Sequence, residues 1–363
     1  MKKPVLFRIT NNLGLGGVQR RLDSLLPRLT RFYQVHVVTY RDKGLFFDQL
    51  SQKGVHCHFV PLKNKWDLAG IYKLVQLLKK YKADIVHTHS LGGNISGILA
   101  AVLAKVPVRV AQVHVSKLHW YAKTYFHRKK QALEENLIHL FFTHKILFVS
   151  QEAKEYFLDK TVGLEKKCMV LHNGIEFPAE IPWQLPRELR NYQRKKIIGF
   201  VGRLAQGKGL RLFLRFAQDV LQRSNEYVFV IIGPGQLEFW AQKIPKPFKK
   251  NILLLGPKRD VFPYYKVMDL LFFGSKPGIE GMPGVVLEAA SMGLPILARQ
   301  TKPLQEIKQF YTRIAFIQES KTPLENLEHA LNLPFDSGQK FKEHFSIEAM
   351  VERTVKLYDS LCA

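Results

Sequence analysis

Short apolar runs rich in β-branched residues alternate along the chain with longer segments in which apolar residues recur every three or four positions. The short runs predict strands, and the longer segments predict helices with one buried face. This alternation is typical of parallel sheets covered by helices. In the first half it predicts strands at 5–10, 35–40, 55–60, 85–89, 108–113 and 146–149, and helices at 18–29, 68–80 and 95–105.

The alternation stops at residues 177–186, which contain three prolines, and stays interrupted through the charged stretch 187–196. It resumes with predicted strands at 197–202, 228–233, 252–256, 270–273 and 295–298. Because 363 residues suit two cores better than one, we predict two α/β domains. Their predicted limits are 1–177 and 196–344, with a linker at 178–195 and a closing helix in 345–363 that begins at the cap-like Ser346.

The formal charge of +25 predicts an anionic partner: nucleic acid, an acidic membrane surface or a phosphorylated small molecule. Residues 116–130 interleave bases with aromatic residues. Such a segment suits an anionic bilayer, single-stranded nucleic acid or a solvated helix with an aromatic core face.

Three scattered cysteines argue for a reducing compartment, and no apolar window is long enough to span a bilayer. The N-terminal apolar run is interrupted at Arg8, unlike a signal peptide. These features predict a cytoplasmic location, with or without contact to a membrane face.

Glycines follow the first strand at Gly14, Gly16 and Gly17, where a helix is predicted to open. They allow backbone N–H groups to approach a phosphate, although a plain tight turn is an equal alternative. Gln19 stands where a dinucleotide-binding motif has its last glycine, and no P-loop lysine follows.

A second strand–loop–helix junction, at 200–210, carries Arg203 and Lys208 around a glycine-bearing turn. Both side chains suit a diphosphate at the carboxyl end of a strand, where open α/β sheets bind ligands. The alternative is two solvated surface cations.

Two glutamates, Glu280 and Glu288, lie eight positions apart around a junction of small residues. Pro283 suits the first turn of a helix, which would leave Glu280 in the preceding loop and Glu288 within the helix. The two carboxylates would then bind hydroxyls at different levels, or be ordinary surface charges.

Histidines end two predicted strands. His87 and His89 point to the same side of their strand, so a metal pair is conceivable, but the sequence shows no third ligand. His114 suits a ligand hydroxyl, or it is a histidine satisfied within the fold.

Together and in this order, the motifs resemble the retaining, nucleotide-sugar-dependent glycosyltransferases of family 4. The resemblance rests on residues 15–17, 84–89, 148–150, 172–176, 201–209, 232–235, 255–256 and 280–289. It implies the GT-B architecture: two Rossmann-like doubly wound parallel-sheet domains facing across a cleft, with the last helix crossing back to the first domain. The first domain would take the acceptor and the second the donor.

The resemblance also implies residue roles. Arg203 and Lys208 would hold the donor diphosphate, Glu288 would bind the nucleotide ribose, and Glu280 would bind hydroxyls of the transferred sugar. Backbone groups of Gly281, Met282, Pro283 and Gly284 would assist Glu280, while Gly16, Gly17 and His114 would meet the donor's phosphates and sugar. No cofactor and no metal are expected, because cations and helix N-termini would stabilise the leaving diphosphate.

The expected partners are a nucleotide sugar, a glycan or lipid-linked acceptor and an anionic membrane surface, with no nucleic acid. Surface polysaccharide or glycoconjugate synthesis is the expected context. The competing hypotheses are a nucleotide-sugar epimerase of similar shape and a basic nucleic-acid-binding protein. The approach to Glu280 through Ser275 is longer than the family often has, which places the details of the sugar pocket in doubt.

Overall fold

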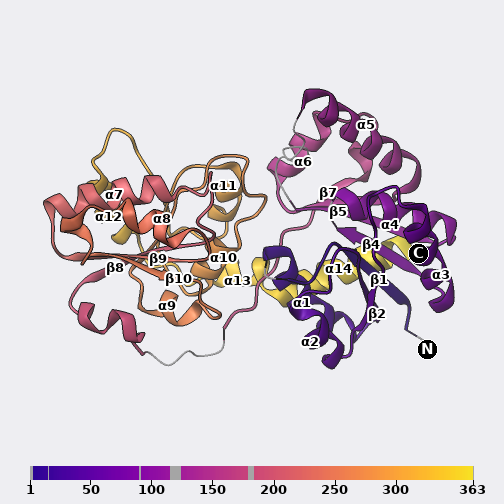
Figure 1. Ribbon diagram of the computed structural model, residues 1–363, viewed down its shortest axis with the longest axis horizontal. Coiled ribbons are helices and arrows are strands. Elements are labelled where there is room, and N and C mark those ends of the chain that lie inside the picture. Colours follow the sequence, from indigo (N-terminus) through magenta and orange to yellow (C-terminus); the bar gives the residue numbers. More distant parts are fainter. Residues whose placement is uncertain (1–2, 15, 90, 115–123, 179–183, 363) are drawn as a thin grey trace. The chain divides into compact units, whose positions relative to one another are not determined.

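The computed structural model describes residues 3–14, 16–89, 91–114, 124–178 and 184–362. The chain forms two compact units (Figure 1). The first consists of Met1–Glu176 with Phe345–Ala363, and the second of Phe177–His344.

The first unit is built on a seven-stranded, fully parallel sheet of order β3-β2-β1-β4-β5-β6-β7. Its strands are β1 (Val5–Thr10), β2 (Gln34–Thr39), β3 (His56–Phe59), β4 (Ile85–His89), β5 (Val108–Val113), β6 (Lys145–Phe148) and β7 (Cys168–Val170). Its helices are α1 (Gly17–Leu29), α2 (Phe46–Gln52), α3 (Leu68–Tyr81), α4 (Leu91–Leu103), α5 (Tyr125–Phe142), α6 (Gln151–Leu158) and α14 (Ile347–Cys362).

Helices cover both faces of this sheet, which is why its central strands β1 and β4 are buried along their whole length. One core joins α1 and α14 to the sheet through Leu22, Leu25 and Met350. The other joins α3 and α4 to the opposite face through Leu74 and Ala100. The strand order reverses between β1 and β4, so the loops that follow these two strands lead to opposite faces. Open α/β sheets bind ligands at such a point.

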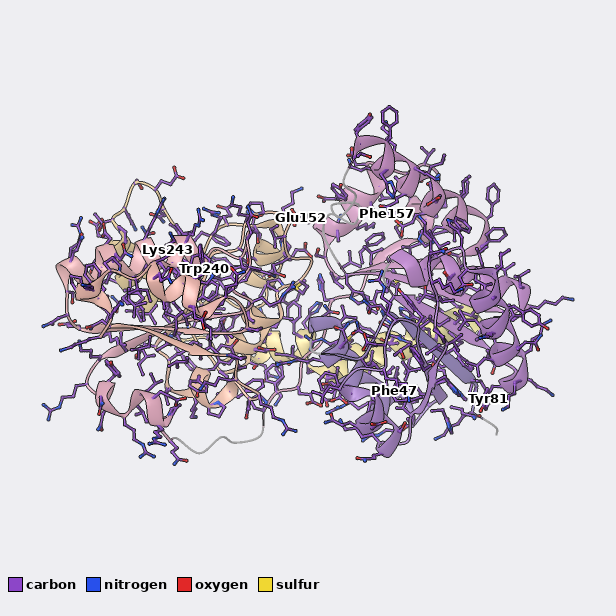
Figure 2. All side chains as sticks on the ribbon, viewed as in Figure 1. Phe47, Tyr81, Glu152, Phe157, Trp240 and Lys243 are labelled. Atoms are coloured by element: carbon purple, nitrogen blue, oxygen red, sulfur yellow. The ribbon has the colours of Figure 1, made fainter. Side chains whose placement is uncertain are left out.

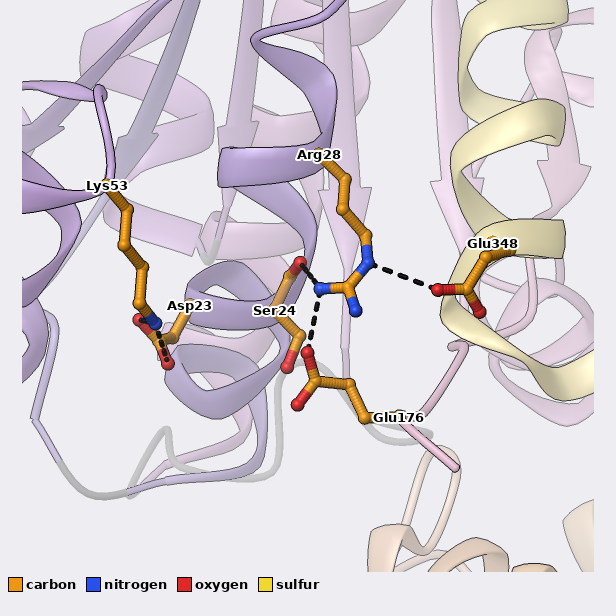
Figure 3. A network of polar contacts seen from close by, with 6 residues as sticks. All are labelled: Asp23, Ser24, Arg28, Lys53, Glu176 and Glu348. Carbon is orange, nitrogen blue, oxygen red and sulfur yellow. Dashed lines mark hydrogen bonds and ion pairs between the residues drawn. The ribbon is translucent and has the colours of Figure 1, made fainter. Parts of the chain in front are cut away.

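The helix α14 is fastened where the chain leaves and re-enters the first unit. Ile175 N–H donates to Phe345 O, and Ile347 N–H donates to Ile175 O, each at 2.8 Å. Arg28 of α1 donates to Glu176 at 2.7 Å and to Glu348 at 3.2 Å (Figure 3). The helix predicted at the end of the chain is therefore confirmed.

The second unit holds a six-stranded parallel sheet of order β10-β9-β8-β11-β12-β13. Its strands are β8 (Lys196–Val201), β9 (Tyr227–Ile232), β10 (Ile252–Gly256), β11 (Leu270–Phe273), β12 (Ile296–Ala298) and β13 (Ile314–Phe316). Its helices are α7 (Leu210–Arg223), α8 (Leu237–Gln242), α9 (Phe262–Val267), α10 (Gly284–Ser291), α11 (Lys302–Lys308), α12 (Pro323–Leu331) and α13 (Gln339–Phe345). Trp240 of α8 joins its core, whereas Lys243, just past that helix, is exposed (Figure 2).

The fold class predicted from the sequence, two doubly wound parallel sheets with a C-terminal helix that returns to the first unit, is confirmed. Each predicted strand is present and differs by at most one residue at either end. The three-residue strands β7 and β13 were not predicted from the sequence, whereas β12, which has the same length, was. Pro283 is the N-cap of α10 rather than a residue of its first turn, which is a small correction.

Candidate active site

The loops after β8 and β11 meet at the point where the strand order of the second sheet reverses. Gly209 has φ +87°, and a Cβ there would lie 2.1 Å from the carbonyl oxygen of Gly274. Only glycine allows this approach, because other residues avoid positive φ and would also clash. Lys276 N–H donates to Gly207 O at 2.8 Å. The two loops are therefore in direct backbone contact.

This contact brings Lys208 and Glu280 together. The Nζ of Lys208 donates to Oε1 of Glu280 in an ion pair, although the residues are 72 positions apart in sequence. Their side chains are 16% and 25% exposed, so the pair is sheltered yet reachable from solvent. The sequence predicted a role for each residue but not their pairing. Arg203 lies in the same loop and is exposed, and its carbonyl oxygen accepts from Ala205 N–H at 2.9 Å.

The helix α10 begins four residues after Glu280. Gly281, Met282 and Pro283 are buried, and Pro283 is the N-cap. No described side chain caps this helix, and Val286 and Leu287 are the first residues whose N–H groups donate back, to Pro283 O. The N–H groups of Gly284 and Val285 precede them at the positive end of the helix dipole, which favours an anion.

Glu288 lies one turn into α10 and is half-buried. The hydroxyl of Tyr265, from α9, donates to Oε2 of Glu288 at 3.3 Å and lies 3.4 Å from Val285 O. Tyr265 is 2% exposed, so it is a fixed support for the carboxylate. Tyr265 could not be found from the sequence, since nothing in the local pattern of α9 links it to Glu288.

In the first unit, the glycines after β1 form the start of α1. Gly16 is the N-cap, and a Cβ there would lie 2.3 Å from Oε1 of Gln19. Gln19 itself donates to Oδ1 of Asn12 at 3.1 Å. Gly17 is exposed, and a Cβ there would meet no described atom within 4 Å. The glycines therefore serve a close turn at Gly16 and leave an open surface at Gly17.

The histidines of β4 form a hydrogen-bonded network around Arg8 of β1. Arg8 is 1% exposed; its Nε donates to Nε2 of His89 at 3.1 Å, and its Nη1 lies 2.7 Å from Nδ1 of His87. His89 Nδ1 in turn lies 2.8 Å from Nε2 of the half-buried His114. A guanidinium between two imidazoles would repel a cation, and no group of three metal-ligating side chains occurs among the described residues. The metal-pair interpretation is therefore not supported.

Burial holds several imidazoles of the first unit neutral. It lowers the pKa of His114 to about 3, with Arg8 and Arg21 adding to the effect. Burial and the charge of Arg8 also lower the pKa values of His87 and His89 well below the usual range. On α5, burial and the nearby Lys167 lower the pKa of His139 to about 3.

We expect this first unit to lose stability as the pH falls below about 6.5. The unfolded chain then protonates these histidines while the folded chain does not, so protons favour unfolding. Each such group contributes a slope of about 1.4 kcal/mol per pH unit. Urea unfolding followed between pH 7.5 and 5.5 measures the slope.

The variant His139→Gln should lower this slope by about 1.4 kcal/mol per pH unit, the contribution of one group. The exposed His127 of the same helix gives the matched control, His127→Gln, because it stays in water in both states. Equal slopes for the wild type and His139→Gln would contradict the assignment.

The basic, aromatic segment is only partly visible, because residues 115–123 lie outside the described residues. The part that is described opens α5 and exposes Tyr125 and Phe126, at 66% and 83%. The interpretation as a helix with an aromatic core face is therefore wrong for these residues. Further along, the same helix exposes Leu133, Leu137 and Phe141. None of the described helices has the length and hydrophobicity needed to cross a bilayer.

Comparison with known sequences identifies the family. The model of "Glycosyltransferase Family 4" matches residues 15–177, and that of "Glycosyl transferases group 1" matches residues 195–325. The UDP-Gal:alpha-D-GlcNAc-diphosphoundecaprenol alpha-1,3-galactosyltransferase of Escherichia coli is 30% identical over 304 residues, which cover 78% of this chain and 76% of that protein. The chain belongs to glycosyltransferase family 4. Another relative in the group is the capsular polysaccharide biosynthesis glycosyltransferase CapH of Staphylococcus aureus, 24% identical over 86% of this chain and 85% of that one.

Solved structures agree with the fold of this glycosyltransferase. HepE from Anabaena, crystallised with UDP, superimposes with a TM-score of 0.81 at 15% identity and covers 98% of this chain and 100% of its own. TarM gives a TM-score of 0.74 at 14% identity, with 99% of both chains covered. The enzyme is thus a GT-B glycosyltransferase, and the epimerase and nucleic-acid-binding hypotheses find no support in these matches.

Proposed function

We propose that the enzyme transfers a sugar, with retention of configuration, from a uridine diphosphate sugar to a lipid-linked glycan acceptor during surface polysaccharide synthesis. The observation that carries the proposal is the Lys208–Glu280 pair beside the N-terminus of α10, at the reversal point of the second sheet. This site combines a cation and the first amides of α10 for the diphosphate with carboxylates for the hydroxyls.

The diphosphate is proposed to bind Arg203, Lys208 and the first N–H groups of α10. An arginine and a lysine together offset much of its charge, and the helix dipole adds to them. The N–H groups that follow Glu280, at Gly281, Met282 and Gly284, with Pro283 setting the entry angle, are proposed to line the sugar side. Such fixed positive groups stabilise a leaving diphosphate with no metal ion.

The hydroxyl-rich parts of the donor are proposed to bind the carboxylates. Glu288, oriented by Tyr265, is proposed to accept hydrogen bonds from the ribose hydroxyls. Glu280 is proposed to accept hydrogen bonds from hydroxyls of the transferred sugar. Lys208 meanwhile donates to Oε1 of the same carboxylate. The ion pair is proposed to hold both side chains in place for the ligand.

In the proposed reaction the bond between the anomeric carbon and the β-phosphate oxygen breaks, and an acceptor hydroxyl bonds to the same face of that carbon. The proton of the hydroxyl passes to the departing phosphate oxygen. The sugar of a UDP-hexose is commonly α-linked, and the names of the relatives from Escherichia coli and Campylobacter jejuni specify alpha-1,3 transfer. An α product from an α donor is the outcome of retention, which supports the same stereochemistry here.

The names of those two relatives also specify acceptors linked to diphosphoundecaprenol or diphospho-undecaprenol. We propose an acceptor of this lipid-linked class, bound by the first unit. Gly16 and Gly17 are proposed to contact the donor's phosphates, and His114 its sugar, from the carboxyl edge of the first sheet. The enzyme would then work at the cytoplasmic face of the cell membrane.

We propose that α5 lies on the anionic membrane surface. Phe126, Leu133, Leu137 and Phe141 are exposed and recur at spacings of seven and four, which places them on one stripe of the helix. Lys129 and Lys130 are exposed beside this stripe. Apolar side chains that enter the lipid, flanked by lysines near the phosphates, are typical of a helix at the bilayer interface.

Removal of two rings from the stripe is expected to weaken vesicle binding. We expect Phe126→Ser with Phe141→Ser to lower the affinity for phosphatidylglycerol vesicles on the order of 1,000-fold, since two buried rings at about 2 kcal/mol each contribute about 4 kcal/mol. Sedimentation with vesicles measures the change. Phe335→Ser, which removes an 85% exposed ring from the second unit, is the matched control. Equal binding by both variants would refute the assignment of α5.

Transfer itself is tested with a panel of nucleotide sugars and a lipid diphosphate-linked acceptor, with release of nucleoside diphosphate as the readout. We expect one uridine diphosphate sugar to be consumed only when the acceptor is present. Release of no nucleoside diphosphate from any donor, or an epimerised sugar nucleotide without acceptor, would contradict the proposal.

A further inference from the structure

We propose that Arg8 and His89 are positioning residues that hold His114 in a single tautomer, with the proton on Nδ1, so that it meets its ligand as a hydrogen-bond donor. The inference rests on the proposed function, in which His114 contacts the donor sugar. A row of hydrogen-bonded side chains that starts in the centre of the first sheet would make His114 the donor in that contact.

The side chains of Arg8, His89 and His114 form a continuous row of contacts, which we call the relay. Arg8 of β1 donates from Nε to Nε2 of His89 on β4 at 3.1 Å. The other nitrogen of His89, Nδ1, lies 2.8 Å from Nε2 of His114, just after β5. The rings of His89 and His114 are stacked with centroids 5.0 Å apart. The three residues come from the neighbouring strands β1 and β4 and from the end of β5, in the order in which these strands lie in the sheet.

The arginine fixes the direction of every bond in this chain. A guanidinium only donates, so Nε2 of His89 must accept and carries no proton. In a neutral His89 the proton is then on Nδ1, which donates to Nε2 of His114. His114 accepts there and, when neutral, carries its own proton on Nδ1. That nitrogen has no hydrogen-bond partner among the described residues.

The surroundings keep both imidazoles neutral. Arg8 is fully buried, and the charged or titratable groups near the relay are His87 on β4, Arg21 on α1 and Tyr358 on α14. No carboxylate forms an ion pair with Arg8 among the described residues. Burial and the two arginines lower the pKa of His114 to about 3, so protonation does not disturb the relay at neutral pH.

The far side of the relay is anchored in the C-terminal helix. Nη1 of Arg8 donates to the hydroxyl of Tyr358 at 2.5 Å, and that hydroxyl lies 2.7 Å from Nδ1 of His87. Tyr358 has no exposed surface, and α14 packs against α1. Arg8 is therefore held on two sides by neutral groups, and its Nε remains directed at His89. This explains why a cation without a carboxylate is kept in the sheet.

The proposal is tested directly by determining the tautomer of His114, a measurement that needs no substrate. In histidine-labelled enzyme, the imidazole nitrogen shifts of His114, assigned with the variant His114→Gln, are expected to show protonation at Nδ1 and none at Nε2 at pH 7.5. In His89→Phe, which removes the donor to Nε2, we expect a mixture of tautomers. His36→Phe, which removes another fully buried histidine from β2 outside the relay, should leave the His114 shifts unchanged. An Nε2-protonated or doubly protonated His114 in the wild type would overturn the proposal.

Kinetic measurements distinguish a positioning role of His89 from a general loss of structure. We expect His89→Phe to lower kcat/KM for transfer about 10-fold while the Kd for uridine diphosphate alone stays within about 2-fold, because His114 is assigned to the sugar, which uridine diphosphate lacks. His36→Phe should retain kcat/KM among its folded molecules. Equal losses in both variants would overturn the role of His89 in transfer. A wild type with the expected tautomer but no transfer would instead refute the proposed function.

Discussion

Replacement of Lys208 by alanine is expected to lower kcat/KM for sugar transfer about 100- to 1,000-fold, the loss typical of removing one fixed positive group from a centre that develops negative charge. Lys208 pairs with Glu280, and in the proposed complex it also meets the diphosphate. The variant therefore loses a phosphate contact and leaves Glu280 without this partner. Steady-state kinetics with the donor varied at a saturating acceptor concentration measure the effect.

The control for this variant is Lys249→Ala. Lys249 is an exposed lysine of the same unit, so the change in net charge is the same while the proposed site is intact. We expect the control to retain full activity. Glu280→Gln should lower kcat more than it raises KM, and the double variant should lose less than the sum of the single losses, since the two residues act on one ligand. Full activity in Lys208→Ala would remove this residue from the mechanism.

Replacement of Gly209 by alanine is expected to destabilise the second unit by about 2–5 kcal/mol and to abolish most transfer. Positive φ costs a residue with a side chain about 1–2 kcal/mol, and overpacking adds about 1–3 kcal/mol. The added methyl group would lie 2.1 Å from the carbonyl oxygen of Gly274, which belongs to the backbone and cannot rotate away. The loops must separate, and Lys208 then leaves Glu280.

Gly293→Ala isolates the conformational part of this cost. Gly293 follows α10 with φ +72°, and a Cβ there would meet no described atom within 4 Å. Its destabilisation should therefore be about 1–2 kcal/mol, with transfer retained. Thermal unfolding of both variants gives the comparison. A Gly209→Ala enzyme as stable and active as Gly293→Ala would show that the tight approach of the two loops is unimportant.

Most of the strands and their order along the chain could be predicted from the sequence alone, because strands buried on both faces carry short, mostly apolar runs that need no distant information. It also placed Glu280 in a loop and Glu288 in a helix, as the structure has them. These features depend on neighbours in sequence. The family resemblance suggested roles for the site residues. It did not indicate which side chains pair with one another.

What escaped prediction depends on distant residues. Lys208 meets Glu280 only because Gly209 and Gly274 allow two loops to touch. Arg8 was interpreted only as the charge that interrupts an N-terminal apolar run, yet it is buried, since His89 and the distant Tyr358 offer it acceptors. A charge in an apolar strand is costly unless such partners surround it, and the sequence cannot show which residues will be there.

In the proposed function, the second unit binds the diphosphate of a nucleotide sugar through Lys208 and the N-terminus of α10. Calorimetric titration with uridine diphosphate and with uridine, for the wild type and Lys208→Ala, tests it most directly. We expect the wild type to bind uridine diphosphate at least about 30-fold more tightly than Lys208→Ala does, corresponding to about 2 kcal/mol, whereas uridine should bind both proteins equally. Equal affinity of the two proteins for uridine diphosphate would contradict the claim.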